Sequence, residues 1–351
     1  MIRINYNPEP KVVVNEKRRT IIAETSLAGF LVPEGHPPIR NKFTRNMAYA
    51  LDGLIRRSDV TVYDEGGTAR TANTSTGHLL YGVGSSSSYY HVGIPLFMQY
   101  GIGYTDPTIV DNNLASPDIH LPTNYIDLIE ETDSNTIIFA GRWSPDANKE
   151  YREAGLKWLF IGYDNVATLL ARTIFPPALI REAYVDYFEG YAISLPATFT
   201  KWFARALFSA SRGHARRPAR GMTSTAQDGS KYSIQTPHAF AGTPDVMIGS
   251  DNTPPSPSDY DLKSPIASLA NQAQVVEIDT ALQEARIVRY GTYTPTTDVT
   301  LGEIGLFANI YGFVGGTLAG RKTLLARFAL SETITLVAGT TYNIGIVIKL
   351  S

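Results

Sequence analysis

Histidines are the first residues in this chain that could carry acid–base or metal chemistry. The six histidines are His36, His78, His91, His120, His214 and His238. A zinc site needs ligands at short spacing, as in the H-E-x-x-H motif, and no histidine here stands at such a spacing from another histidine or a carboxylate. The chain also lacks cysteine, which excludes disulfides and thiolate ligands. The sequence therefore predicts scattered loop or surface histidines and no metal centre.

Serine and glycine patterns predict neither a nucleophile nor a nucleotide site. The chain has no G-x-S-x-G elbow, and Gly82-Val83-Gly84 lacks the remainder of either nucleotide-binding fingerprint. A run of serines follows Gly84, which is typical of a loop tip. We interpret this stretch as a loop and not as a phosphate site.

Two groups of carboxylates stand close together in the sequence: Glu130, Glu131 and Asp133, and Asp251, Asp259 and Asp261. A glycosidase needs two carboxylates at a defined separation in a cleft, and calcium needs about six or more oxygen ligands. Neither group has the spacing of a known loop motif, so we interpret both as solvated turns. Calcium at the second group is the alternative. The sequence predicts neither an enzyme nor a cofactor.

Arginines gather in one run, residues 212–220, which reads Arg-Gly-His-Ala-Arg-Arg-Pro-Ala-Arg. Such a run could contact a phosphate backbone, pair with carboxylates on a partner subunit, or form a solvated loop. The net charge of the chain is −2 and only 18% of its residues are charged, whereas nucleic-acid-binding domains are strongly basic. The composition therefore favours a protein partner or a plain loop over nucleic acid.

A repeated phrase indicates that these residues belong to two copies of one module. Glu153-Ala154-Gly155-Leu156 recurs as Glu303-Ile304-Gly305-Leu306, and Leu169-Leu170-Ala171-Arg172 recurs as Leu324-Leu325-Ala326-Arg327. Phe43-Thr44-Arg45 likewise matches Phe199-Thr200-Lys201. The offset between matches drifts, as expected when insertions fall in loops. We expect a matched Glu–Arg ion pair in each copy, and a bulge or close backbone approach at Gly155 and Gly305.

The elements that position these residues are mostly strands. Apolar residues recur at helical spacing in 43–55 and in 199–207, with Thr198 as the expected N-cap of the second helix. Short strand-like runs with Gly, Pro and Thr turns follow each helix, and residues 342–350 alternate as one long strand. The sequence therefore predicts an all-β protein with two tandem jelly-roll-like β-sandwich domains, residues 43–197 and 198–351, each led by a helix.

Residues 1–42 precede the repeat and contain two strand-like runs, 11–14 and 20–23, with prolines before and after them. They are predicted either as a partly ordered tail or as an extended arm that adds a strand to the sheet of a neighbouring subunit. The loop 80–98 is present only in the first copy and is rich in tyrosine. Candidate contact residues on the arm and the two copy-specific loops are Val12, Val13, Val14, Tyr89, Tyr90, Arg212, Arg216, Arg217 and Arg220.

The second copy carries phrases that resemble virion structural proteins of tailed bacteriophages and related viruses. These phrases are Ile248-Gly249-Ser250, Thr253-Pro254-Pro255, Ser258 to Leu262, Leu301 to Phe307, and the ending Gly339-Thr340-Thr341-Tyr342 with Ile344 to Ile348. The turn Asp64-Glu65-Gly66-Gly67 matches a D-x-G-G turn of the same proteins. The first copy departs from the pattern at Lys157-Trp158 and at Pro176-Pro177. The resemblance implies a virion component without specifying which one.

These observations predict a non-enzymatic virion structural protein that is made in the host cytoplasm and has no membrane partner, since no apolar signal core or membrane-length run is visible. It would assemble with itself, as a trimer or hexameric ring, and with other virion proteins in a tail, a baseplate or an accessory capsid layer. A capsid protein with a double jelly roll is the alternative. A carbohydrate- or receptor-binding module is another, with Tyr89, Tyr90, Tyr104 and Trp143 as sugar-stacking candidates.

Overall fold

The computed structural model describes Ile4 and residues 8–72, 96–123, 125–160, 166–211, 222–235 and 239–350. Within them the chain is predominantly β, as predicted, and has two helices. The elements that precede the second helix are β1 (Lys11–Asn15), β2 (Thr20–Val32), β3 (Ile39–Phe43), α1 (Arg45–Arg56), β4 (Val60–Tyr63), β5 (Ala69–Ala72), β6 (Leu96–Gly101), β7 (Pro117–Pro122), β8 (Tyr125–Glu130), β9 (Ser134–Trp143), β10 (Lys149–Phe160), β11 (Val166–Arg181) and β12 (Tyr187–Pro196). The others are α2 (Lys201–Ser211), β13 (Thr223–Thr225), β14 (Lys231–Ile234), β15 (Phe240–Gly249), β16 (Pro265–Ser268), β17 (Ala270–Asp279), β18 (Glu284–Tyr293), β19 (Val299–Val314), β20 (Thr317–Leu336) and β21 (Tyr342–Leu350).

The elements from α1 to β12, here called the first half, form two runs of paired strands. One run has the order β7-β6-β10-β11, and the other has the order β8-β9-β12. The elements from α2 to β21, the second half, show the same arrangement. Their runs have the orders β16-β15-β19-β20 and β17-β18-β21.

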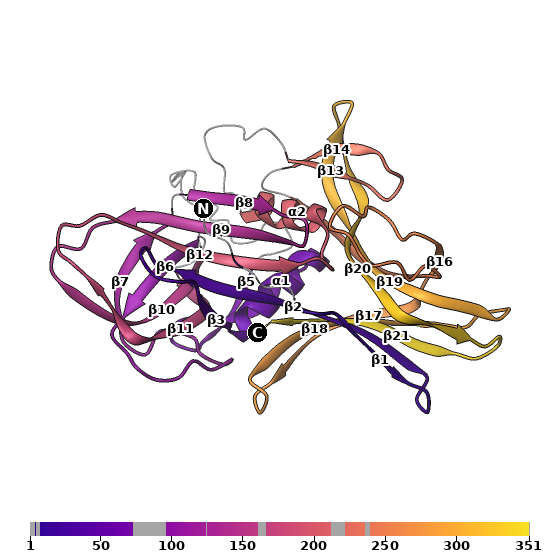
Figure 1. Ribbon diagram of the computed structural model, residues 1–351, viewed down its shortest axis with the longest axis horizontal. Helices are drawn as coiled ribbons and strands as arrows, with labels where there is room; N and C mark the ends of the chain where they lie inside the picture. Colours follow the sequence, from indigo (N-terminus) through magenta and orange to yellow (C-terminus); the bar gives the residue numbers. More distant parts are fainter. Residues whose placement is uncertain are drawn as a thin grey trace.

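Strand β2 joins the two halves (Figure 1). Its residues Thr20–Leu27 pair in parallel with Asn343–Leu350 of β21, and its residues Ala28–Val32 pair antiparallel with Gly190–Ser194 of β12. Alternate β2 side chains from Ile21 onward are buried, as expected for a strand with one face against a core. The large sheet therefore runs continuously from one half to the other.

The described strands of the predicted N-terminal arm, residues 1–42, pair within their own chain. β1 pairs antiparallel with β2, and β3 pairs with both β2 and β11. Local patterns identified two strand-like runs here. They could not identify the partners, because β2 pairs with segments that lie far away in the sequence.

Both helices lie against strands of both halves. α1 contacts β4 and β11 of the first half and β15, β17 and β18 of the second, whereas α2 contacts β8 and β9 as well as β20. One continuous cluster of buried apolar side chains includes residues of both halves, among them Leu51, Leu54, Phe203, Ile304 and Leu325. The two halves therefore share one core.

The start of α2 differs from the prediction in one detail. The expected N-cap, Thr198, instead shares a buried hydrogen bond of 2.7 Å with Thr25 of β2. Thr200 is the residue directly before the helix, and its hydroxyl oxygen accepts a 3.3 Å hydrogen bond from the Phe203 amide. Threonine is a favoured N-cap type at either position, so the sequence alone could not separate them.

Candidate functional site

The structure brings Glu153 and Arg172 together as a buried ion pair between β10 and β11. The Arg172 Nη2 atom lies 2.8 Å from Glu153 Oε2, and both side chains are buried. Arg172 also forms a 2.7 Å ion pair with Asp111 and donates to the carbonyl of Thr105 at 2.9 Å. Each buried charge thus has several partners, as burial of charge requires.

The second half repeats this arrangement around Glu303 and Arg327. Arg327 Nε lies 2.6 Å from Glu303 Oε2, and its other nitrogens pair with Asp259 at 3.1 Å and Asp251 at 3.0 Å. Asp251 and Asp259 were interpreted from the sequence as a solvated turn, which is wrong, since both bind the buried guanidinium. Hydrogen bonds from Thr253, together with Arg327, lower the pKa of Asp251.

Each glutamate also accepts hydrogen bonds from the backbone of a nearby loop, which is the β6–β7 loop for Glu153 and the β15–β16 loop for Glu303. Glu153 accepts hydrogen bonds from the backbone amides of Gly103, Ala115 and Ser116 at 2.7–3.0 Å. Glu303 accepts the corresponding bonds from Lys263 and Ser264 at 3.1 and 2.7 Å. With its oxygens committed to an arginine and to amides, neither carboxylate is placed to exchange a proton with a substrate. We interpret both sites as structural.

The glycines of these sites permit the close contacts. A Cβ atom built on Gly249 would lie 2.4 Å from Glu303 Oε1, and one built on Gly101 would lie 2.7 Å from Glu153 Oε1. Gly155 and Gly305 face leucine side chains in the same way, with hypothetical Cβ distances of 2.6 and 2.7 Å. Strand pairing places Gly101 opposite Glu153 and Gly249 opposite Glu303.

At Lys157 the first half departs from the repeated sequence pattern, and the structure shows what this lysine contacts. Lys157 is fully buried, and its Nζ atom bonds the carboxylate of Glu65 and the side-chain oxygen of Asn113. Burial lowers the pKa of Lys157, opposed by its bond to Glu65. Phe307 occupies the matching register position in the second half. Lys157 therefore ties the Asp64–Gly67 turn to β10 in the first half alone.

A second buried polar cluster in the first half was missed by the sequence analysis. Arg181 Nε lies 2.7 Å from Glu189 Oε1, and the Tyr100 hydroxyl donates to Glu189 Oε2 at 2.8 Å. Burial and the Glu189 carboxylate raise the pKa of Tyr100. The same cluster binds the backbone of Glu34, in the turn between β2 and β3.

The matching register positions in the second half are apolar: Ile248, Leu336 and Ile344. Aligning the two repeats position by position would have shown a Tyr, an Arg and a Glu opposite Ile, Leu and Ile. That contrast is the signal from which the cluster could have been found.

The predicted contact residues are only partly within the described chain. On β1, Val13 and Val14 are 51% and 43% exposed, and Val12 packs partly against the core. The loop candidates Tyr89, Tyr90, Arg212, Arg216, Arg217 and Arg220 lie outside the described residues. Of the sugar-stacking candidates, Tyr104 is exposed, whereas Trp143 is buried among aromatic side chains and cannot stack on a ligand.

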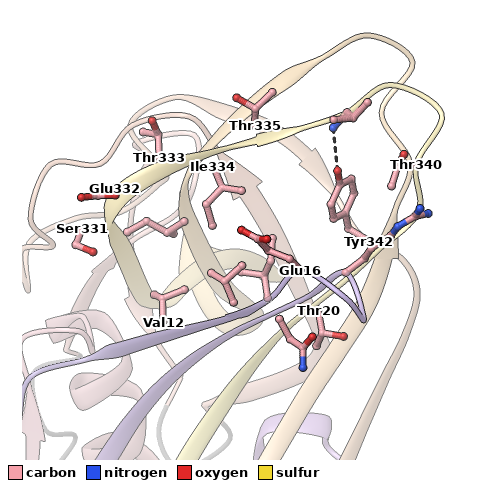
Figure 2. A pocket seen from close by; sticks show the side chains of 16 residues that line it. Val12, Glu16, Thr20, Ser331, Glu332, Thr333, Ile334, Thr335, Thr340 and Tyr342 are labelled. Carbon is pink, nitrogen blue, oxygen red and sulfur yellow. Dashed lines mark hydrogen bonds between the residues drawn. The ribbon is translucent and has the colours of Figure 1, made fainter.

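A groove of about 600 Å³ lies beside β1. Figure 2 shows Val12 and Glu16 on one wall and Ser331–Thr335 of β20 on the other. Tyr342 lies at one end, where its hydroxyl accepts a 3.0 Å hydrogen bond from the Val337 amide. The charged lining residues are Glu16, Arg19 and Glu332. The groove combines apolar side chains with an excess of negative charge, an environment suited to an amphipathic segment and not to a small anion.

Comparisons of the chain with protein-family models, with curated proteins and with solved structures give no match. In the described part of the chain, neither helix has the length and apolar character needed to cross a membrane. The same residues contain no group of three or more His, Asp or Glu side chains arranged to hold a metal ion.

Proposed function

We propose that this protein is a structural component of a virion that works by assembly through two duplicated, jelly-roll-like β-domains. The observation that carries the proposal is the repetition of one architecture within the chain. Both halves have the same order of paired strands and the same buried Glu–Arg site, and in both a threonine before the helix bonds the β11 or β20 backbone. Such repetition supports a building block that presents similar surfaces twice.

The junction between the halves supports the same proposal. β2 belongs to the sheets of both halves, and each helix packs against both. The relative orientation of the two β-domains is therefore held by main-chain hydrogen bonds and by a shared core. A rigid tandem of this kind lets three chains present six similar domains in a ring, which suits a tail, a baseplate or an accessory capsid layer.

Mass in solution tests this proposal directly. Size-exclusion chromatography with light scattering should give a trimer or a closed ring of the 38.4 kDa chain. Val13→Lys, on the exposed face of β1, should lower that mass without changing the circular dichroism spectrum. Val275→Lys, at an exposed position of the edge strand β17, is the matched control. A monomer at every concentration, with wild type and both variants alike, would contradict assembly by the chain itself.

A further inference from the structure

The two halves differ in how the gap between their two runs of strands is closed. In the first half, β3 pairs with β2 through Ile39–Asn41 and then with β11 through Lys42–Phe43. It lies on the edge of β2 opposite β12, since both pair with Gly29–Leu31. The order β12-β2-β3-β11 is therefore continuous, and β3 closes this side of the sandwich.

In the second half the corresponding closure is incomplete. β1 takes the position of β3, because it pairs with Thr20–Glu24 on the edge of β2 opposite β21. Among the described strands, however, β20 pairs with β19 and not with β1. The groove described above lies between β1 and β20. We call this gap the open seam.

The chain cannot fill the open seam with the segment that would be equivalent to β3. In the first half, β3 directly precedes α1. Before α2, the chain is still paired in β12 up to Pro196, and the helix begins at Lys201. Thr198 and Phe199, which lie between them, meet β20 as Lys42 and Phe43 meet β11: Phe199 bridges Ala326, and the Thr198 carbonyl accepts a hydrogen bond from the Arg327 amide. No length remains for a strand along β1.

The side chains along the open seam are more exposed than their counterparts in the first half. Leu179 of β11 is buried, with 2% of its surface exposed. Its register counterpart in β20, Ile334, is only partly buried and lines the groove. Val14, on the opposite wall, is 43% exposed. Apolar side chains on both walls therefore face the gap between β1 and β20, whereas in the first half β3 pairs directly with β11.

We infer that the open seam is a docking site for one extended segment of another protein, in which apolar residues alternate with Lys or Arg. The segment must have both edges free, because among the described strands β1 and the 330–335 stretch of β20 have no strand partner on the side of the groove. Glu16 and Glu332 outnumber Arg19 along the groove, which favours basic side chains. β3, which bridges β2 and β11 in the first half, reads Ile39-Arg40-Asn41-Lys42-Phe43. This inference rests on the proposed structural role, for which a donated strand would be the link to a neighbouring virion protein.

Because the chain has no cysteine, one introduced thiol can report on the groove. Thr333→Cys carries an environment-sensitive dye inside the groove, and Thr280→Cys carries it in the exposed β17–β18 turn as the control. The probe is a synthetic peptide with the sequence of residues 38–44. We expect the dye at position 333 to report saturable peptide binding and the dye at position 280 to report none. We also expect slower amide hydrogen exchange in β1 and in residues 330–335.

Charge variants make the test specific. Glu16→Lys with Glu332→Lys should weaken peptide binding about five- to tenfold, as expected for the loss of two exposed ion pairs. A peptide with both basic residues changed to Glu should bind the wild type at least as weakly. Equal binding of the acidic peptide, or no saturable signal at position 333, would overturn the inference.

Light scattering on the same charge variant separates this inference from the proposed function. An unchanged assembly mass together with weakened peptide binding supports the docking site. A mass that falls when the groove is altered would show that a second copy of the chain occupies the groove, which overturns the assignment to another protein. A wild-type monomer that still binds the peptide would contradict self-assembly and leave the docking site supported.

Discussion

Glu189 provides the sharpest test of how the first half is stabilised. Its carboxylate is fully buried and bonds Arg181 at 2.7 Å and the Tyr100 hydroxyl at 2.8 Å. In Glu189→Ile, Arg181 keeps its charge in a site where only 2% of its surface reaches solvent. Removing one partner of a buried ion pair costs about 3–5 kcal/mol, because the remaining charge is left without compensation. We expect a loss of that size in the free energy of unfolding.

The second half indicates which replacement should restore stability. Its matching positions are Ile, Leu and Ile, so this site in the fold accepts an apolar cluster. We therefore expect the triple variant Tyr100→Phe, Arg181→Leu and Glu189→Ile to lie within about 2 kcal/mol of the wild type, since replacing a whole buried ionic cluster by apolar groups is often neutral or stabilising. Phe is chosen at position 100 because it retains the aromatic ring and avoids a cavity.

Urea unfolding followed by tryptophan fluorescence measures both effects by linear extrapolation. Glu182→Gln, at an exposed position, is the control and should change the free energy of unfolding by less than about 0.5 kcal/mol. The reasoning is refuted if Glu189→Ile costs less than about 1 kcal/mol, or if the triple variant is as unstable as the single one.

Two further predictions concern the second half. Gly249→Ala should destabilise the protein by about 1–3 kcal/mol, because the new Cβ would lie 2.4 Å from Glu303 Oε1; Gly66→Ala, whose nearest contact would be 3.4 Å away, should change little in the same urea assay. Burial disfavours the charged form of Asp245 and so acts to raise its pKa. Hydrogen bonds, of which the bond from Lys322 has the largest effect, outweigh burial and lower the pKa below its usual 3.8. A lowered pKa means that the ionised carboxylate adds stability above pH 3.8, which is lost as pH falls through the folded-state pKa. Asp245→Asn should therefore be less stable at neutral pH and should show a smaller stability loss below about pH 4; equal acid sensitivity of the two proteins would refute this.

Much of the local structure could be predicted from the sequence, because its signals are local. Helical spacing located both helices, alternation located β21, and the repeat drew attention to Glu153, Arg172, Glu303 and Arg327. These residues recur at matching places in the two halves, and the structure joins them in two similar ion pairs.

The remaining features depend on partners that local patterns do not specify. Nothing near Thr20 indicates that β2 pairs with β21 on one stretch and with β12 on the next. Asp251 and Asp259 lie in a proline-rich loop, which suggests exposure, and only the position of Arg327 makes them ion-pair partners. A carboxylate such as Glu189 is most often on the surface. Its burial could be inferred from the sequence only by aligning the two copies, which places an isoleucine opposite it.

The parallel pairing of β2 with β21 also affects how the chain reaches its folded state. Thr20 pairs with Asn343, so the contact closes nearly the whole chain into one loop, and contacts of such high sequence separation form slowly. During synthesis β2 leaves the ribosome long before β21, and until then one of its edges has no native partner. Exposed strand edges of this kind promote aggregation. We therefore expect refolding to be slow and its yield to fall with protein concentration, with the completion of β2 by β21 as the late step.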